Sequence, residues 1–267
     1  MIKRILPVAL ALLFAACGGG GGGGDNGSTN TPPVGGGLAP PPPTVGDITL
    51  LFMGNSHTAV NDLPGMVTAM VRAGKPGKTV GSIQSPGGMF LDERLSYAPS
   101  VNLLRSQDWS FVILQAQKYS STGTVQYSTE EAQEWVRMSR AQHAVPIMFP
   151  EWPRRGIDET QRIFDMHVSI AQAEPACVAP IPQAFDLALA RNPTLILHDP
   201  DGNHSSSAGA FLAALVLYAT ITGLSPLDLP PLPQFSVATS VQATLRDIAA
   251  ETVLTVPPRM WCPGDPI

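Results

Sequence analysis

Two short segments near opposite ends of the chain carry side chains that could perform nucleophilic catalysis. Gly54-Asn55-Ser56 directly follows the apolar run at 48–53, and Asp201-Gly202-Asn203-His204 lies about 145 residues further on. A buried strand that breaks at glycine and leads into serine exposes a hydroxyl nucleophile at the edge of a sheet. An aspartate three residues before a histidine can orient the imidazole that takes the proton from that hydroxyl. We therefore expect Ser56 to be the nucleophile, His204 the general base and Asp201 the carboxylate that orients it.

The apolar pattern between these segments predicts the elements that must bring them together. The runs at 48–53 and 109–115 are continuous, as expected for strands with helices over both faces. We also expect strands at 79–84 and 145–149, short apolar or extended pieces at 177–181 and 195–197, and helices at 62–72, 129–143, 158–173, 182–190, 205–222 and 236–251. Strands that alternate with helices in this way indicate an α/β fold with a parallel sheet between two helical layers.

A parallel sheet would place the candidate residues at one of its edges. Ser56 follows the first strand, Gly87-Gly88 follows the second, Gln115 ends the third, and Asp201 and His204 precede a late helix. In open α/β sheets, ligands bind outside the carboxyl ends of the strands. We therefore expect these groups to meet at the carboxyl edge.

The motifs resemble those of the SGNH (GDSL-like) hydrolase superfamily, in the branch that has Gly-Asn-Ser in place of Gly-Asp-Ser. The matching residues are Gly54-Asn55-Ser56 and Asp201-x-x-His204, with Gly87 or Gly88 as the second block. The resemblance implies a flavodoxin-like three-layer α/β/α sandwich that hydrolyses esters through an acyl-enzyme and needs no metal or other cofactor. It also implies an oxyanion hole made by the backbone N–H groups of Ser56 and of Gly88 or Gly87.

The third block departs from this family pattern. Where the family has Gly-x-Asn-Asp after the third strand, this chain has Leu114-Gln115-Ala116-Gln117. Gln115 either supplies a third oxyanion donor through a side chain longer than that of asparagine, or serves as a structural amide at the end of the strand. The departure concerns this donor and leaves the Ser–His pair unaffected.

Neighbouring residues have simpler structural interpretations. We interpret His57 as a residue on the rim of the site and not as the base, since adjacent side chains rarely face each other productively. Trp109 and Trp152 are expected to pack in the interior, although Glu151-Trp152 follows the strand at 145–149 and could border the pocket.

Two alternative functions belong to different classes. A metal-dependent hydrolase would use His198, Asp199, Asp201 and His204 as ligands, with His57 as a further candidate, to activate a water molecule. A non-catalytic lipoprotein on the same fold would instead bind glycan or another envelope polymer. We favour a serine esterase that acts on O-acetyl or other short-acyl esters, with an acylated carbohydrate as the expected substrate.

The first 17 residues predict export. Lys3 and Arg4 precede an apolar stretch at 5–16, which has the length of a signal-peptide core and is too short to span a bilayer. Cys17 follows small residues as in a bacterial lipobox, so we expect a lipid on Cys17, with an ordinary signal peptide as the alternative. By the same resemblance, the glycine that follows Cys17 favours the outer membrane.

Composition divides the remaining chain into a tether and one domain. Residues 18–45 are rich in Gly and Pro, which predicts a disordered tether, and residues 46–267 are enough for one α/β domain. The net charge of −5 and the lack of Lys/Arg clusters argue against nucleic-acid binding. Cys177 and Cys262 form an even pair in an exported domain, so they are expected to be bonded to each other or, alternatively, to remain free thiols.

Overall fold

A computed structural model describes residues 45–267 of the chain. The predicted signal peptide, its Cys17 and nearly all of the predicted tether lie outside the described residues. Among the described residues, no helix combines the length and the apolar character that crossing a bilayer requires.

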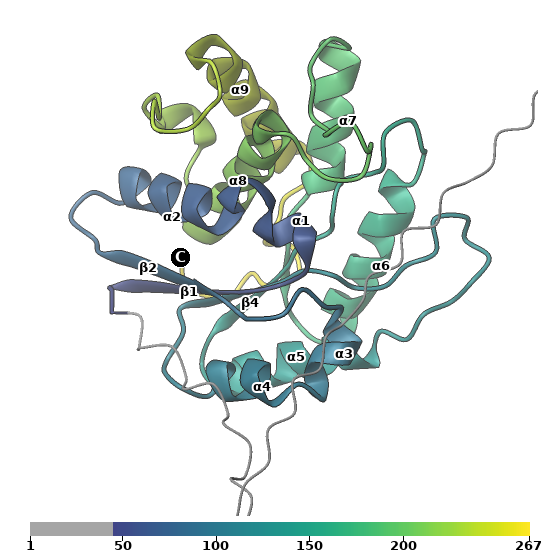
Figure 1. Ribbon diagram of the computed structural model, residues 1–267. Helices are drawn as coiled ribbons and strands as arrows, with labels where there is room; N and C mark the ends of the chain where they lie inside the picture. The colour runs from purple at the N-terminus through teal and green to yellow at the C-terminus, as the bar shows by residue number, and fades with distance from the viewer. Residues whose placement is uncertain (1–44) are drawn as a thin grey trace, which may run out of the picture. The chain divides into compact units, whose positions relative to one another are not determined.

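Five parallel strands form the central sheet, in the order β2-β1-β3-β4-β5 (Figure 1). Their bounds are β1 Ile48–Met53, β2 Val80–Gln84, β3 Phe111–Leu114, β4 Val145–Met148 and β5 Cys177–Val178. Strands β3 and β4 are buried along their whole length, and so is β1 after its first residue. The predicted parallel sheet is therefore confirmed, and β1 lies inside it, between β2 and β3.

Helices cover both faces of this sheet, as predicted (Figure 1). One face carries α2 Leu63–Gly74, α7 Ile181–Arg191, α8 Ser207–Thr222 and α9 Thr239–Thr255; the other carries α3 Leu91–Leu95, α4 Ala98–Leu104, α5 Glu130–Ala141 and α6 Thr160–Ala173. Leu50 and Phe52 of β1 pack in the first core, whereas Leu51 and Met53 pack in the second, because successive side chains of a strand point to opposite faces. The result is the expected three-layer sandwich.

Helix α8 is the most deeply buried helix of the first layer. Fourteen of its 16 residues are buried, from Gly209 to Thr222. Ser206 caps its N-terminus by accepting a hydrogen bond from the Gly209 N–H, and Gly223 ends it in the left-handed conformation at φ 66°. The loop that carries Asp201 and His204 therefore runs directly into a fixed element of the core.

A disulfide joins Cys177 of β5 to Cys262 in the C-terminal tail, with a Cα–Cα distance of 5.1 Å. Of the two alternatives that the sequence left open for these cysteines, the structure has the bonded pair. The bond attaches the last segment of the chain to the edge strand of the sheet.

Cys262→Ser is expected to lower the free energy of unfolding by about 2–4 kcal/mol, because the bond closes a long loop and so restricts the unfolded chain. The two cysteines are 85 residues apart. Urea unfolding of the oxidised protein, the reduced protein and the variant measures the effect. Reduction should lower the urea concentration at the unfolding midpoint of the natural chain and leave that of Cys262→Ser unchanged. Equal midpoints for all three samples would show that the disulfide contributes nothing to stability.

Candidate active site

The turn after β1 presents Ser56 to solvent. Gly54 ends the strand, and a Cβ atom there would lie 2.1 Å from Thr58 Oγ1 and 2.4 Å from Gln115 Oε1, so only glycine fits. Asn55 then caps the short helix α1 (Ser56–Ala59): its side-chain oxygen accepts a hydrogen bond of 3.0 Å from the His57 N–H. Ser56 is exposed at the first position of this helix.

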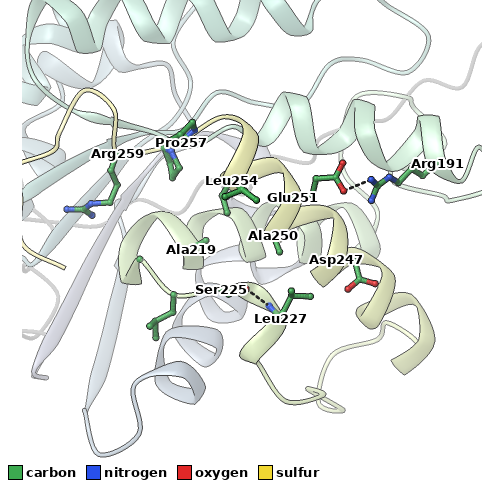
Figure 2. Close-up of a pocket in the computed structure, with 14 residues that line it drawn as sticks. Arg191, Ala219, Ser225, Leu227, Asp247, Ala250, Glu251, Leu254, Pro257 and Arg259 are labelled. Carbon is green, nitrogen blue, oxygen red and sulfur yellow. Dashed lines mark hydrogen bonds and ion pairs between the residues drawn. The ribbon is translucent and has the colours of Figure 1, made fainter.

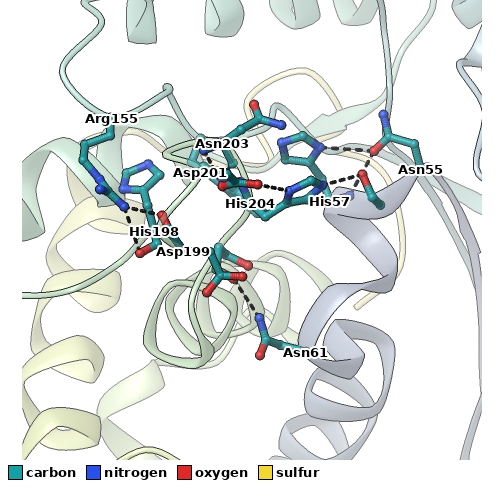
Figure 3. A network of polar contacts seen from close by, with 12 residues as sticks. Asn55, His57, Asn61, Arg155, His198, Asp199, Asp201, Asn203 and His204 are labelled. Carbon is teal, nitrogen blue, oxygen red and sulfur yellow. Dashed lines mark hydrogen bonds and ion pairs between the residues drawn. The ribbon is translucent and has the colours of Figure 1, made fainter. Parts of the chain in front are cut away.

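Ser56, His204 and Asp201 are aligned by hydrogen bonds. His204 Nε2 lies 2.8 Å from Ser56 Oγ. On the other side of the ring, His204 Nδ1 lies 2.5 Å from Asp201 Oδ2 (Figure 3). The other Asp201 oxygen accepts backbone N–H groups of Asn203 and His204, at 2.9 and 3.0 Å. The structure therefore brings together the three residues that the sequence analysis selected, in the order that a serine nucleophile requires.

Hydrogen bonding keeps the Asp201 carboxylate ionised. The His204 side chain and the two backbone N–H groups lower the pKa of Asp201 to about 2. Asp201 is therefore negatively charged throughout the neutral range, although its side chain is 48% exposed. A carboxylate in this state can stabilise a positive charge that forms on His204.

Three side chains hold the loop of Asp201 and His204 against the rest of the site. Asn61, itself in the left-handed region at φ 60°, donates to the Ser205 carbonyl at 2.8 Å and accepts from the Ser207 hydroxyl at 3.0 Å. Trp152 donates to the Asn203 carbonyl at 2.8 Å, and Arg155 donates to the His198 carbonyl at 3.2 Å. Figure 3 shows Asn61 and Arg155 beside this loop. Trp152 is 1% exposed, which confirms its predicted packing role.

His57 lies beside the triad and outside it. Its ring stacks on His204 with centroids 5.3 Å apart and contacts Trp152 at 5.1 Å. Burial, with repulsion from His204, lowers the pKa of His57 to about 4, so it is neutral at neutral pH. The prediction that His57 is a rim residue is wrong in one respect, because its side chain is only 6% exposed and forms part of the packed wall.

Gln115 positions the nucleophile turn and is not free to act as the third oxyanion donor. Its Oε1 accepts the Asn55 N–H at 2.8 Å and the Thr58 hydroxyl at 2.9 Å, and its Nε2 donates to Glu151 at 3.0 Å. The residue is completely buried. Of the two roles that the sequence left open for Gln115, these contacts describe the structural amide.

The turn after β2 faces Ser56. Gly87 and Gly88 line a hollow of about 640 Å³ together with Asn55 and Ser56. Gly87 has φ 77°, a conformation that favours glycine, and a Cβ atom on Gly88 would lie 3.9 Å from the Asn55 Cα. The second block therefore lies next to the first, as the resemblance implied.

A pocket of about 600 Å³ opens beside Ser56 and His204. Its wall also includes Asn55, His57, Phe90, Lys118, Tyr119, Tyr127, Glu151, Arg154 and Asn203. The mixture of aromatic, amide and charged side chains can accommodate a polar substrate with an apolar face. Glu151 borders this pocket, as predicted from its place after the strand at 145–149. Phe90, Lys118, Tyr119, Tyr127 and Arg154 could not be predicted, because they come from loops whose direction no pattern predicts.

A larger groove of about 730 Å³ lies at the other end of α8 and includes no triad residue (Figure 2). Ala219 and Gly223 at the end of α8, Leu227, and Leu254 of α9 line it. A helix of 16 residues is about 24 Å long, which separates this groove from the catalytic loop at the start of α8. It is therefore distinct from the candidate active site.

Glu151 is a partly buried carboxyl group in the wall of the catalytic pocket. Burial raises its pKa to about 7, the nearby Glu159 adds to the rise, and the hydrogen bond from Gln115 opposes it. A carboxyl group with a raised pKa binds more protons in the folded protein than in the unfolded chain between about pH 4.5 and 7. Its contribution to stability therefore falls as the pH rises through this window.

Glu151→Gln is expected to become more stable than the natural chain as the pH rises, because glutamine keeps the acceptor for Gln115 and carries no buried charge. The difference in unfolding free energy should grow by about 1–3 kcal/mol between pH 4.5 and pH 8. Urea unfolding across this range measures it, with Glu130→Gln on the exposed start of α5 as the matched control. A difference that stays constant with pH would contradict the raised pKa.

The alternative metal site is not assembled. His198 is buried, and its Nε2 contacts the Pro153 carbonyl at 2.8 Å, away from the triad. His204 uses both ring nitrogens on Ser56 and Asp201. Among residues 45–267, the ligand atoms that converge within reach of one ion belong to Cys177, Cys262 and Asp265, and both sulfur atoms are in the disulfide. These contacts do not fit a metal-dependent hydrolase.

Solved structures share this fold. A protein from Slackia heliotrinireducens, described as a candidate SGNH hydrolase, is 25% identical over 65% of this chain and 98% of its own, with a TM-score of 0.54. A DUF4886 family protein from Bacteroides uniformis is 15% identical over 79% of this chain and 95% of its own, with a TM-score of 0.63. TesA is 15% identical over 66% of this chain and 98% of its own, with a TM-score of 0.51. No family model and no curated protein matches the chain.

The fold and the aligned side chains define a hydrolase of the α/β sandwich class. Within that class, the structural neighbours are SGNH (GDSL-like) hydrolases and a DUF4886 family protein, and they support the SGNH superfamily for this chain. The fold that the sequence motifs predicted is therefore confirmed, and the neighbours support the predicted superfamily.

Proposed function

We propose that the protein is a serine esterase that hydrolyses short-acyl esters through a Ser56–His204–Asp201 triad. The observation that carries the proposal is the continuous pair of hydrogen bonds, 2.8 Å and 2.5 Å long, from Ser56 through His204 to Asp201. In the first step Ser56 Oγ attacks the ester carbonyl and its proton passes to His204 Nε2. The alcohol then leaves with that proton, and the acyl group stays on Ser56.

Water completes the reaction on the same groups. His204 takes a proton from a water molecule, which attacks the acyl-enzyme and releases the carboxylic acid as Ser56 regains its proton. Asp201 holds the imidazole with Nδ1 protonated and stabilises its positive charge in both steps. The backbone N–H groups of Ser56 and Gly88 are the proposed donors to the oxyanion, and each such donor typically contributes about 100- to 1000-fold in rate.

The pocket supports an acylated carbohydrate as the substrate class. Phe90 and Tyr127 are 36% and 41% exposed in its wall, where an aromatic ring can pack against the apolar face of a sugar. Lys118, Arg154 and Asn203 offer hydrogen bonds to its hydroxyl groups. The esters that this class implies are O-acetyl or other short-acyl groups.

Hydrolysis of p-nitrophenyl acetate and butyrate by the purified protein, with and without EDTA, tests the proposal. We expect turnover that ignores EDTA, together with a fluorophosphonate adduct that peptide mass spectrometry assigns to Ser56. Loss of turnover on chelation would favour a metal-dependent reaction. No turnover of these esters or of acetylated polysaccharides, with glycan binding retained, would favour the binding lipoprotein.

We also propose that the protein is exported and anchored by a lipid on Cys17. The disulfide between Cys177 and Cys262 supports an oxidising compartment, where such bonds persist. We expect the natural chain to incorporate a labelled fatty acid and Cys17→Ala to lose this label. Equal labelling of the two chains would exclude Cys17 as the site of the lipid.

A further inference from the structure

Arg94 of α3 is a fully buried arginine whose contacts are oxygen atoms of neutral groups. It is 0% exposed, and it forms no ion pair with any carboxylate of the described residues. Burying a charge without a counter-ion is unfavourable unless its hydrogen bonds are satisfied. A hydrophobic residue at this position would avoid the free-energy cost of burying a charge. The presence of arginine there therefore calls for a functional explanation.

The guanidinium binds the two turns that flank Ser56. Its Nη2 donates to the carbonyl oxygens of Gly54 and Gly87. Its Nη1 donates to the Pro86 carbonyl at 3.1 Å, to Ser85 Oγ at 3.0 Å and to Ser100 Oγ at 2.8 Å. One side chain thus joins the nucleophile turn after β1 to the glycine turn after β2.

These contacts fix the direction of the neighbouring N–H groups. The peptide bond is planar and trans throughout residues 45–267, so each C=O points away from the N–H of the next residue. Holding the Gly87 carbonyl on Arg94 therefore directs the Gly88 N–H the opposite way. Holding the Gly54 carbonyl does the same for the Asn55 N–H, which donates to Gln115 Oε1 at 2.8 Å.

The positive charge of Arg94 also makes the Gly88 N–H a stronger hydrogen-bond donor. A cation bound to a peptide oxygen polarises that peptide and makes its N–H a stronger donor. Gly88 lines the hollow that Ser56 shares, where negative charge would develop during ester hydrolysis. The charge would therefore act on the transition state through the backbone.

We propose that Arg94 is a positioning residue, which holds the Ser56 and Gly88 turns in register and polarises the Gly88 N–H as an oxyanion donor. This inference rests on the proposed esterase function. It assigns no contact between Arg94 and the substrate, because the side chain lies behind the backbone of both turns.

The kinetic test compares Arg94→Lys with Ser100→Ala. Lysine keeps the charge but cannot hold carbonyls of both turns in the geometry of a guanidinium. Ser100→Ala removes one Arg94 contact and the 2.8 Å contact between the Ser100 and Ser85 hydroxyls, and it leaves the Arg94 contacts with the Gly54, Pro86 and Gly87 carbonyls in place. We expect Arg94→Lys to lower kcat for p-nitrophenyl acetate by about 10- to 100-fold with KM changed less than about threefold, and Ser100→Ala to stay within about threefold of the natural chain.

A thionoester of the same alcohol separates positioning from partial misfolding. An oxyanion hole distinguishes C=O from C=S, so weakening it should reduce the ratio of ester to thionoester hydrolysis in Arg94→Lys. Misfolding lowers the active fraction and leaves this ratio unchanged. An unchanged ratio, or an equal loss in Ser100→Ala, would overturn the inference.

Hydrogen exchange tests the structural part without any turnover. We expect Arg94→Lys to exchange faster at 54–58 and 85–90 and to match the natural chain in α8 and α9. Exchange that is faster throughout the domain would reduce Arg94 to a general stability role, and unchanged exchange would show that it does not hold the turns. If the natural chain hydrolyses no ester, the proposed function fails, and the exchange result still decides whether Arg94 joins the two turns.

Discussion

Ser56→Ala is expected to lower kcat for short-acyl esters by about 10⁴- to 10⁶-fold, because it removes the atom that forms the acyl-enzyme. The remaining rate would come from a water molecule activated by His204 beside an intact oxyanion hole. The fold should survive, since the Ser56 side chain is exposed and, among residues 45–267, its hydroxyl forms a hydrogen bond with His204 at the surface. Turnover of p-nitrophenyl acetate and labelling by a fluorophosphonate measure the loss together.

Ser96→Ala is the matched control for this variant. Ser96 is an exposed serine at the end of α3, whose hydroxyl donates to the Glu93 carbonyl and does not line the catalytic pocket. It should keep activity within about twofold of the natural chain. If Ser56→Ala retained more than about a tenth of the natural rate, the nucleophile would have to be another group.

Asp201→Asn is expected to lower kcat by about 10²- to 10³-fold. The amide cannot stabilise a positively charged His204, and it can hold the ring in the wrong tautomer by donating to Nδ1. We expect a smaller loss than for a deeply buried aspartate, because Asp201 is 48% exposed and water can replace part of its effect. Pre-steady-state kinetics with p-nitrophenyl acetate would show acylation slowed, with little change in KM.

Asp199→Asn provides the same chemical change two residues away. Asp199 contributes its backbone to the loop: its N–H donates to the His204 carbonyl and its own carbonyl accepts from Arg155. This variant should therefore keep activity within about threefold. Equal losses in the two variants would mean that general disturbance of the loop, and not the loss of one carboxylate, causes the effect.

The order of strands and helices was predictable, and so was the meeting of Ser56, His204 and Asp201, because their signals are local or strongly periodic. The run at 48–53 followed by Gly54-Asn55-Ser56 marks a buried strand with an exposed serine, and β1 with Ser56 has this arrangement. The apolar stretch before Gly223 likewise became α8. Once the sheet is parallel, its carboxyl edge brings distant motifs together.

The supporting groups could not be predicted, because their roles depend on direction inside the core. The two short helices α3 and α4 lie between 91 and 104, where no helix was expected, and α3 carries Arg94. Gln115 was recognised by position, yet its contacts with Asn55 and Glu151 depend on which way its amide points. A sequence records neither the burial of a charge nor the carbonyl oxygens that surround it.

The deep burial of α8 also bears on when the candidate site can assemble. Ser56 and His204 are 148 residues apart, and the base loop is followed at once by the helix that packs against α2 and α9. A chain that ends before residue 207 would contain all three triad residues and lack the helix that holds two of them in place. Under the proposed export and esterase function, an unfolded precursor would have no assembled nucleophile, and hydrolysis would begin only after the chain has folded at its destination.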